Sequence, residues 1–199
     1  MSALEFWFDF ASTYSYLAMM RITPLARAAG VTLRYRPFLL GPLFKANGWD
    51  TSPFNLYAAK GRNMWRDLER QCVDLGLPFK KPEPFPQNSL AAARVALIGL
   101  NDGWGADFSR AVFAAEFGDG RSIGDMAVLG DILTQLELDA APVFDAAGSE
   151  ANKSALRAQT EAAQRLGIYG APSFTTADGE LFWGNDRLER ALAWAKDGR

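Results

Sequence analysis

Strand-like patterns at both ends of the chain enclose a long middle part with helical spacing. Residues 4–10 are almost all apolar, which is typical of a strand inside a sheet. Residues 14–29 have apolar positions at helical spacing and end at Gly30, but Pro24 predicts a kink or a break. Residues 31–37 alternate apolar and polar side chains, which predicts a second strand. The chain therefore begins β-α-β.

The middle of the chain, from about residue 40 to residue 167, is predicted to be mainly helical. Its Ala-rich segment begins with Asn88 or Ser89 as a cap, and two other segments end at a glycine, Gly76 and Gly167. The predicted helices are residues 55–75, 88–100, 106–118, 125–136 and 149–166. Neither an internal repeat nor a low-complexity linker interrupts them.

The end of the chain returns to strand periodicity. Residues 173–176 and 180–183 are joined by Ala177-Asp178-Gly179, which is a hairpin signal, and residues 186–196 form a closing helix. The order β-α-β, helices, β-β-α predicts an α/β protein with a thioredoxin-like fold. Residues 1–40 and 168–199 would form that fold, and residues 41–167 would be a large inserted all-helical domain.

Composition narrows the possible functions. The net charge is −2 and the Lys and Arg residues are scattered, so nucleic-acid binding has no electrostatic basis. No apolar run reaches the roughly 18 residues that a membrane span needs. The N-terminus lacks the pattern of a secretory signal, so we expect a cytoplasmic protein without a membrane partner.

Histidine is absent and cysteine occurs once, which excludes several catalytic classes. Ser-His-Asp and Cys-His catalysis, histidine metal sites, CxxC motifs and thiolate zinc clusters cannot form. The single Cys72 lies on the apolar side of a helical pattern with Leu68 and Leu75, which favours a buried structural role over a reactive one. We therefore expect no metal.

Ser12 occupies the position where a thioredoxin-like protein carries its nucleophilic cysteine. Ser12 or Thr13 falls at the N-cap of the first helix, where unpaired amides and the helix dipole favour negative charge. An ordinary cap without catalytic function is the alternative. If chemistry occurs here, the thiol must arrive on a small molecule.

Two further segments suit a thiol peptide. The Ala171-Pro172 bond directly precedes the hairpin, and in thioredoxin-like proteins a cis proline there faces the start of the first helix. Asn185 or Asp186 is expected to cap the last helix, with Arg187 in solvent as the purely structural reading. The amides and carboxylate there would suit a ligand with an α-carboxylate and an α-ammonium, such as the γ-glutamyl end of glutathione.

Together these motifs resemble the 2-hydroxychromene-2-carboxylate isomerase family, relatives of kappa-class glutathione transferases and of the bacterial disulfide oxidases with a helical insertion. The resemblance spans almost the whole chain. Its motifs are residues 8–12 (FDFAS), 36–41 (RPFLLG), 64–70 (MWRDLER), 88–94 (NSLAAAR), 170–174 (GAPSF) and 184–188 (GNDRL). The chain departs from the family pattern at Thr13, where proline is usual, and at Trp49, which follows Asn47-Gly48.

The resemblance implies glutathione as the cofactor and assigns residues to it. Ser12 would hydrogen-bond the glutathione sulfur, and the backbone before Pro172 would pair with the cysteinyl unit. Asn185 and Asp186 would hold the γ-glutamyl group. The full set of implied glutathione positions is Ser12, Asn47, Lys60, Ala171, Pro172, Asn185, Asp186 and Arg187.

The implied reaction is the glutathione-dependent conversion of 2-hydroxychromene-2-carboxylate, a small aromatic substrate, to trans-o-hydroxybenzylidenepyruvate. A kappa-like transferase that releases a glutathione adduct is one alternative. A thioredoxin-fold binding protein without turnover is another. Disulfide exchange is excluded because one cysteine outside the turn cannot perform it. A homodimer is expected only from the resemblance.

Overall fold

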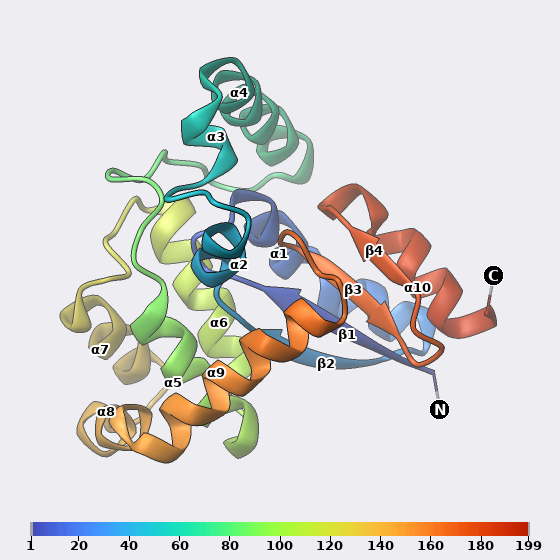
Figure 1. The fold of residues 1–199 in the computed structure, drawn as a ribbon. Helices are drawn as coiled ribbons and strands as arrows, with labels where there is room; N and C mark the ends of the chain where they lie inside the picture. Colours follow the sequence, from blue (N-terminus) through green and yellow to red (C-terminus); the bar gives the residue numbers. More distant parts are fainter. Residues whose placement is uncertain (1, 199) are drawn as a thin grey trace.

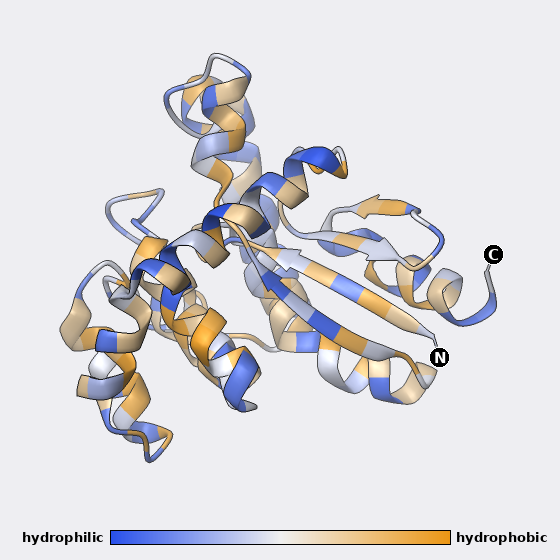
Figure 2. Cartoon of the chain, turned by 60° about the horizontal axis from the view of Figure 1, so that its bottom comes forward, coloured by the Kyte–Doolittle hydropathy of each residue, from blue (hydrophilic) through white to orange (hydrophobic). Residues whose placement is uncertain are grey.

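A four-stranded mixed sheet forms the centre of the molecule in a computed structural model that describes residues 2–198 (Figure 1). The strand order is β2-β1-β3-β4, with β1 parallel to β2 and antiparallel to β3, and with β3 antiparallel to β4. The strands are β1 Ala3–Phe8, β2 Thr32–Pro37, β3 Ser173–Thr176 and β4 Leu181–Trp183. The predicted β-α-β beginning and β-β-α end are confirmed. Hydrophobic positions predominate along the central β1, whereas hydrophilic positions recur along the edge strand β2 (Figure 2).

Helices cover both faces of the sheet. Helix α1 (Thr13–Ala29) and helix α10 (Leu188–Asp197) pack together on one face, and α9 (Glu150–Arg165) lies over the other. Buried aromatic side chains fill the core, including Phe6 stacked on Phe174 at 5.5 Å. Each such buried side chain contributes about 1.5–3 kcal/mol relative to an exposed one.

A kink or a break was expected at Pro24; helix α1 runs through this residue without a break. A proline inside a helix costs about 3 kcal/mol. The helix buries Tyr16, Leu17 and Ile22 completely, and this burial outweighs the single backbone hydrogen bond that Pro24 removes.

The middle of the chain is helical as predicted, but its divisions differ. The predicted helix over residues 55–75 is interrupted at Tyr57, and the predicted helix over residues 106–118 ends as a π-helix. The short α2 and α8 were not predicted separately. The observed helices are α2 Leu40–Ala46, α3 Pro53–Leu56, α4 Ala58–Leu75, α5 Leu90–Asp102, α6 Gly105–Phe113, the π-helix Ala114–Gly118, α7 Met126–Gln135 and α8 Ala140–Gly148. The domain division at residues 40 and 168 stays a prediction.

The last helix begins differently from the prediction. A 3-10 turn, Asn185–Arg187, precedes α10, and the residue before that turn is Gly184 with a φ of 106°. Neither Asn185 nor Asp186 caps the helix with its side chain, because both lie inside the 3-10 turn. Over residues 2–198, every helix is too short or too polar to cross a membrane.

Candidate active site

Ser12 caps α1 and touches the loop before β3. Its hydroxyl accepts a hydrogen bond from the Ser15 amide at 3.3 Å and donates one to the Ala171 carbonyl at 2.8 Å. Thr13, the other cap candidate, donates instead to the Met64 sulfur at 3.4 Å. The structure therefore places one hydroxyl, that of Ser12, between the start of α1 and the β3 loop.

The peptide bond between Ala171 and Pro172 is cis, as predicted. The Pro172 carbonyl accepts a hydrogen bond from the Gly184 amide at 3.0 Å, and the Ser173 hydroxyl donates to the Gly170 carbonyl at 2.8 Å. The first bond joins the proline loop to the segment between β4 and α10, and the second closes the proline loop on itself. The predicted approach of Ala171 to Ser12 is confirmed by their hydrogen bond.

Asp9 fixes the position of the Ser12 loop, and sequence reasoning missed it. Its carboxylate accepts hydrogen bonds from the Ala11 amide at 3.0 Å and from the Leu40 amide at 2.7 Å. Burial raises the pKa of Asp9, and these backbone amides only partly oppose that rise. The available signal was an acidic residue directly after an otherwise apolar strand.

A cavity of about 670 Å³ opens beside Ser12. Most of its wall is apolar and aromatic, and the segments around α1, α2, α3, the proline loop and the end of β4 contribute to it. Its aromatic lining residues are Tyr14, Phe44, Trp49, Phe54, Phe85, Tyr169 and Trp183. Pockets of this size and character bind small organic molecules.

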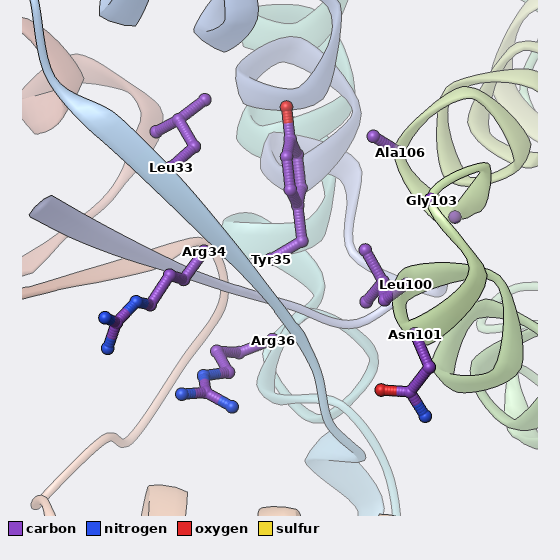
Figure 3. A pocket seen from close by; sticks show the side chains of 9 residues that line it. Leu33, Arg34, Tyr35, Arg36, Leu100, Asn101, Gly103 and Ala106 are labelled. Atoms are coloured by element: carbon purple, nitrogen blue, oxygen red, sulfur yellow. The ribbon is translucent and has the colours of Figure 1, made fainter.

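A second hollow of about 400 Å³ lies beside the edge strand β2 (Figure 3). It runs between β2 and the turn that joins α5 to α6, where Tyr35 stands beside Ala106 (Figure 3). Arg34 and Arg36 extend from the opposite side of the strand, and Arg36 pairs with Glu5 at 2.7 Å. None of the predicted site residues lines this hollow, so we assign no function to it.

A hydrogen-bond chain connects the start of α1 with the segment before α10. Tyr14 donates to Asp67 at 2.9 Å, and Gln71 donates to the same carboxylate oxygen at 2.7 Å. The Gln71 carbonyl oxygen then accepts a bond from the Asn185 side-chain amide at 2.9 Å. Burial and the Asp67 carboxylate raise the pKa of Tyr14, so its hydroxyl stays protonated and can donate.

Asn185 is the predicted γ-glutamyl residue that the structure buries. Its side-chain oxygen has no hydrogen-bond partner among the described residues, although the residue is only 5% exposed. A buried polar atom left without a partner is costly, and a ligand donor would relieve that cost. An ammonium group is such a donor.

The other predicted glutathione residues are less closely gathered. Lys60 lines the cavity, and its ammonium lies 5.1 Å from the centre of the Tyr57 ring. Asp186 and Arg187 are exposed and pair with each other at 2.9 Å. Asn47 is exposed, donates to the Leu43 carbonyl at 2.9 Å and does not line the cavity. Asn185, Asp186 and Arg187 do not line the cavity either, so the glutathione roles of all four residues stay predictions.

The single cysteine, Cys72, and the buried carboxyl group of Glu116 lie outside this cavity. Cys72 is buried, and burial raises the pKa of its thiol to about 11, which suits the predicted structural role. Glu116 in the π-helix is fully buried, and neither carboxylate oxygen has a partner among residues 2–198. Burial, and then the charge of Asp9, raise the pKa of Glu116 well above its usual range.

The arrangement fits a small thiol peptide. Ser12 lies at a helix N-terminus that favours a thiolate, and the Ala171 backbone beside it is at the start of an extended segment. Asn185 offers a buried acceptor at the far end of a hydrogen-bonded chain. Among the described residues, no cluster of acidic or cysteine side chains is arranged to hold a metal ion.

Comparison with known proteins points to one family. The model of the DSBA-like thioredoxin domain matches residues 3–193. A 2-hydroxychromene-2-carboxylate isomerase of Sphingobium xenophagum is 32% identical over 188 residues, which cover 94% of each chain. A solved 2-hydroxychromene-2-carboxylate isomerase structure superimposes with a TM-score of 0.86 and 27% identity, covering 96% of this chain and 93% of the other. Glutathione S-transferase kappa 1 of Caenorhabditis elegans is 35% identical over 83 residues, 41% of this chain and 36% of the transferase.

Proposed function

We propose that this chain, which belongs to the 2-hydroxychromene-2-carboxylate isomerase family and has a DSBA-like thioredoxin domain, is a glutathione-dependent isomerase of that substrate class. Its substrate would be 2-hydroxychromene-2-carboxylate, and its product trans-o-hydroxybenzylidenepyruvate. The observation that carries the proposal is the Ser12 hydroxyl, held 2.8 Å from the Ala171 carbonyl at the edge of an aromatic cavity.

The isomerisation needs a nucleophile that adds and leaves again. Bound glutathione would supply a thiolate that adds reversibly to the conjugated double bond, so that the bond can rotate before the thiolate is released. The chain supplies no cysteine of its own there, because Cys72 is buried in α4. Ser12 replaces it with a hydroxyl donor.

Ser12 would stabilise the thiolate by rotating its hydroxyl proton. That proton now points to the Ala171 carbonyl, and the same oxygen accepts from the Ser15 amide. The rotation would leave the cap bond intact while the hydroxyl donates to sulfur. The dipole of α1 favours negative charge at the same point. Both effects lower the pKa of a thiol placed beside Ser12.

Asn185 and Asp186 would hold the γ-glutamyl end. The unpartnered oxygen of Asn185 and the exposed carboxylate of Asp186 are both acceptors for an ammonium group. Arg187 follows them and could pair with a carboxylate. The likeness to a kappa-class glutathione transferase supports glutathione as the cofactor.

The cavity wall supports a flat aromatic partner. Its lining includes seven aromatic residues and three prolines, and Lys60 is a cation that could face an organic acid. We place the reaction in the cytoplasm, where glutathione is reduced, and we expect a homodimer. Conjugation of electrophiles with release of the adduct is the second candidate, favoured by the transferase match.

The test is the conversion of 2-hydroxychromene-2-carboxylate by the purified chain with and without reduced glutathione. The proposal predicts conversion only in the presence of glutathione. It also predicts a thermal shift, since ligand at 100 times its dissociation constant adds about 2.7 kcal/mol of stability. Equal conversion without glutathione, or no heat of binding and no thermal shift at millimolar glutathione, would overturn it.

A further inference from the structure

An exposed aromatic pair belongs to the wall of the cavity and takes no part in the hydrogen bonds around Ser12. Tyr169 is 58% exposed and Trp183 is 48% exposed, and their ring centres lie 5.2 Å apart. They come from the loop before the cis proline and from the end of β4. Both line the cavity. Two large adjacent rings left open to solvent at a cavity mouth mark a surface that binds a ligand.

Gly170 holds the indole of Trp183 close to the reaction centre. A Cβ at this position would lie 2.4 Å from the indole nitrogen and 3.1 Å from the adjacent ring carbon. Only glycine lets the indole lie this close to the backbone. The next residue is Ala171, whose carbonyl accepts the Ser12 hydroxyl. The indole of Trp183 therefore packs on the residue next to Ala171, whose carbonyl bonds Ser12.

Two other aromatic pairs of the cavity wall are less open to solvent than Tyr169 and Trp183. Phe44 and Trp49 lie 6.1 Å apart, and Phe54 lies 6.5 Å from Tyr14. All four of these side chains are half-buried. The rings of Tyr169 and Trp183 are therefore more exposed to solvent than these four rings. A substrate whose reacting carbon is bonded directly to an aromatic ring must place that ring near the sulfur.

We infer that Tyr169 and Trp183 form the surface on which the aromatic ring of the substrate stacks, and that they make the site selective for aromatic over aliphatic conjugated acids. This inference rests on the proposed function. It assigns no glutathione contact to either residue, so loss of the pair should leave glutathione binding intact.

The experiment measures the binding of chromone-2-carboxylate, a stable flat bicyclic acid, by calorimetry at saturating glutathione. The variants are Trp183→Leu and Tyr169→Leu. Trp194→Leu is the matched control, because Trp194 packs on Phe182 and donates to Asp178, outside the cavity. Loss of the indole should raise the dissociation constant about tenfold, from lost burial and stacking. The control and the glutathione affinity should change by less than about twofold.

A conservative variant keeps the test decisive if a leucine variant folds poorly. Trp183→Phe retains a flat ring, so it should bind the chromone within about threefold of the unchanged chain. The ligand-induced quenching of tryptophan fluorescence should become smaller but persist, because Trp49 also lines the cavity. Unchanged chromone affinity in Trp183→Leu, or an equal loss of glutathione affinity, would overturn the inference. Failure of the proposed function is distinguishable, since it would show as absent glutathione binding in the unchanged chain.

Discussion

Replacing Ser12 with alanine separates a catalytic hydroxyl from an ordinary helix cap. The change removes the bond to the Ala171 carbonyl and the cap bond from the Ser15 amide. Loss of a serine cap costs about 0.5–2 kcal/mol of stability. Both readings of Ser12 predict this loss, so stability alone cannot distinguish them.

Turnover distinguishes the two readings. A hydrogen bond to a charged group contributes about 1.5–3 kcal/mol, which corresponds to a roughly 10- to 150-fold loss in rate if it acts on the thiolate. The half-saturation constant for glutathione should change by less than about threefold, because the hydroxyl contacts only the sulfur. Ser12→Thr retains a hydroxyl and should keep more turnover than Ser12→Ala.

The assay follows the loss of chromene absorbance while substrate and glutathione are varied in turn, at several pH values. Thermal unfolding of the same samples confirms that each variant is folded. Without the hydroxyl, the pKa of the bound thiol should rise, so the rate of Ser12→Ala should recover partly as pH increases. Full turnover of Ser12→Ala across the pH range would refute the reasoning and leave Ser12 as a cap.

Three further predictions address the surroundings of the site. Gln71→Leu removes the hydrogen-bond partner of the Asn185 side-chain amide. The half-saturation constant for glutathione should therefore rise about tenfold, with little change in the maximal rate. A change in the maximal rate alone would contradict this prediction. Folding raises the pKa of Glu116, so the free energy of unfolding should fall as pH rises above about 4.5. Denaturant titrations at several pH values should show a weaker fall for Glu116→Gln than for the unchanged chain. Identical pH profiles of the two proteins would contradict this prediction. Cys72 should resist thiol reagents in the native protein and react only after unfolding, and rapid native labelling would show that it is not buried.

Local patterns were sufficient to predict the framework of the fold. The apolar run before Asp9 and the hairpin signal around Gly179 are patterns of residues adjacent in the sequence. The strand β1 and the hairpin of β3 and β4 that they predict are both present. The cis bond at Pro172 was also predicted, because the topology limits what can face the start of α1. The unbroken α1 at Pro24 could not be predicted, since it depends on tertiary burial.

Contacts between distant segments explain what sequence reasoning missed at the site. Asp9 binds the amide of Ala11 and the distant amide of Leu40, and Gln71 lies 114 positions from its partner Asn185. No local pattern marks such pairs. Trp183 resembled an ordinary strand residue, and its place over Gly170 emerges only when the proline loop meets β4. Asn47 followed from the resemblance alone, and it does not line the cavity, although Phe44 and Trp49 on either side of it do.

The most direct test of the central claim is the amount of product formed per glutathione consumed. The unchanged chain would be given 2-hydroxychromene-2-carboxylate in large excess over glutathione. The products would be separated, and their amounts would be compared with the amount of free thiol that remains. An isomerase that releases its thiolate predicts many equivalents of trans-o-hydroxybenzylidenepyruvate with the thiol fully recovered. Product limited to one equivalent, or thiol lost to a stable adduct, would contradict the isomerase account and favour the transferase.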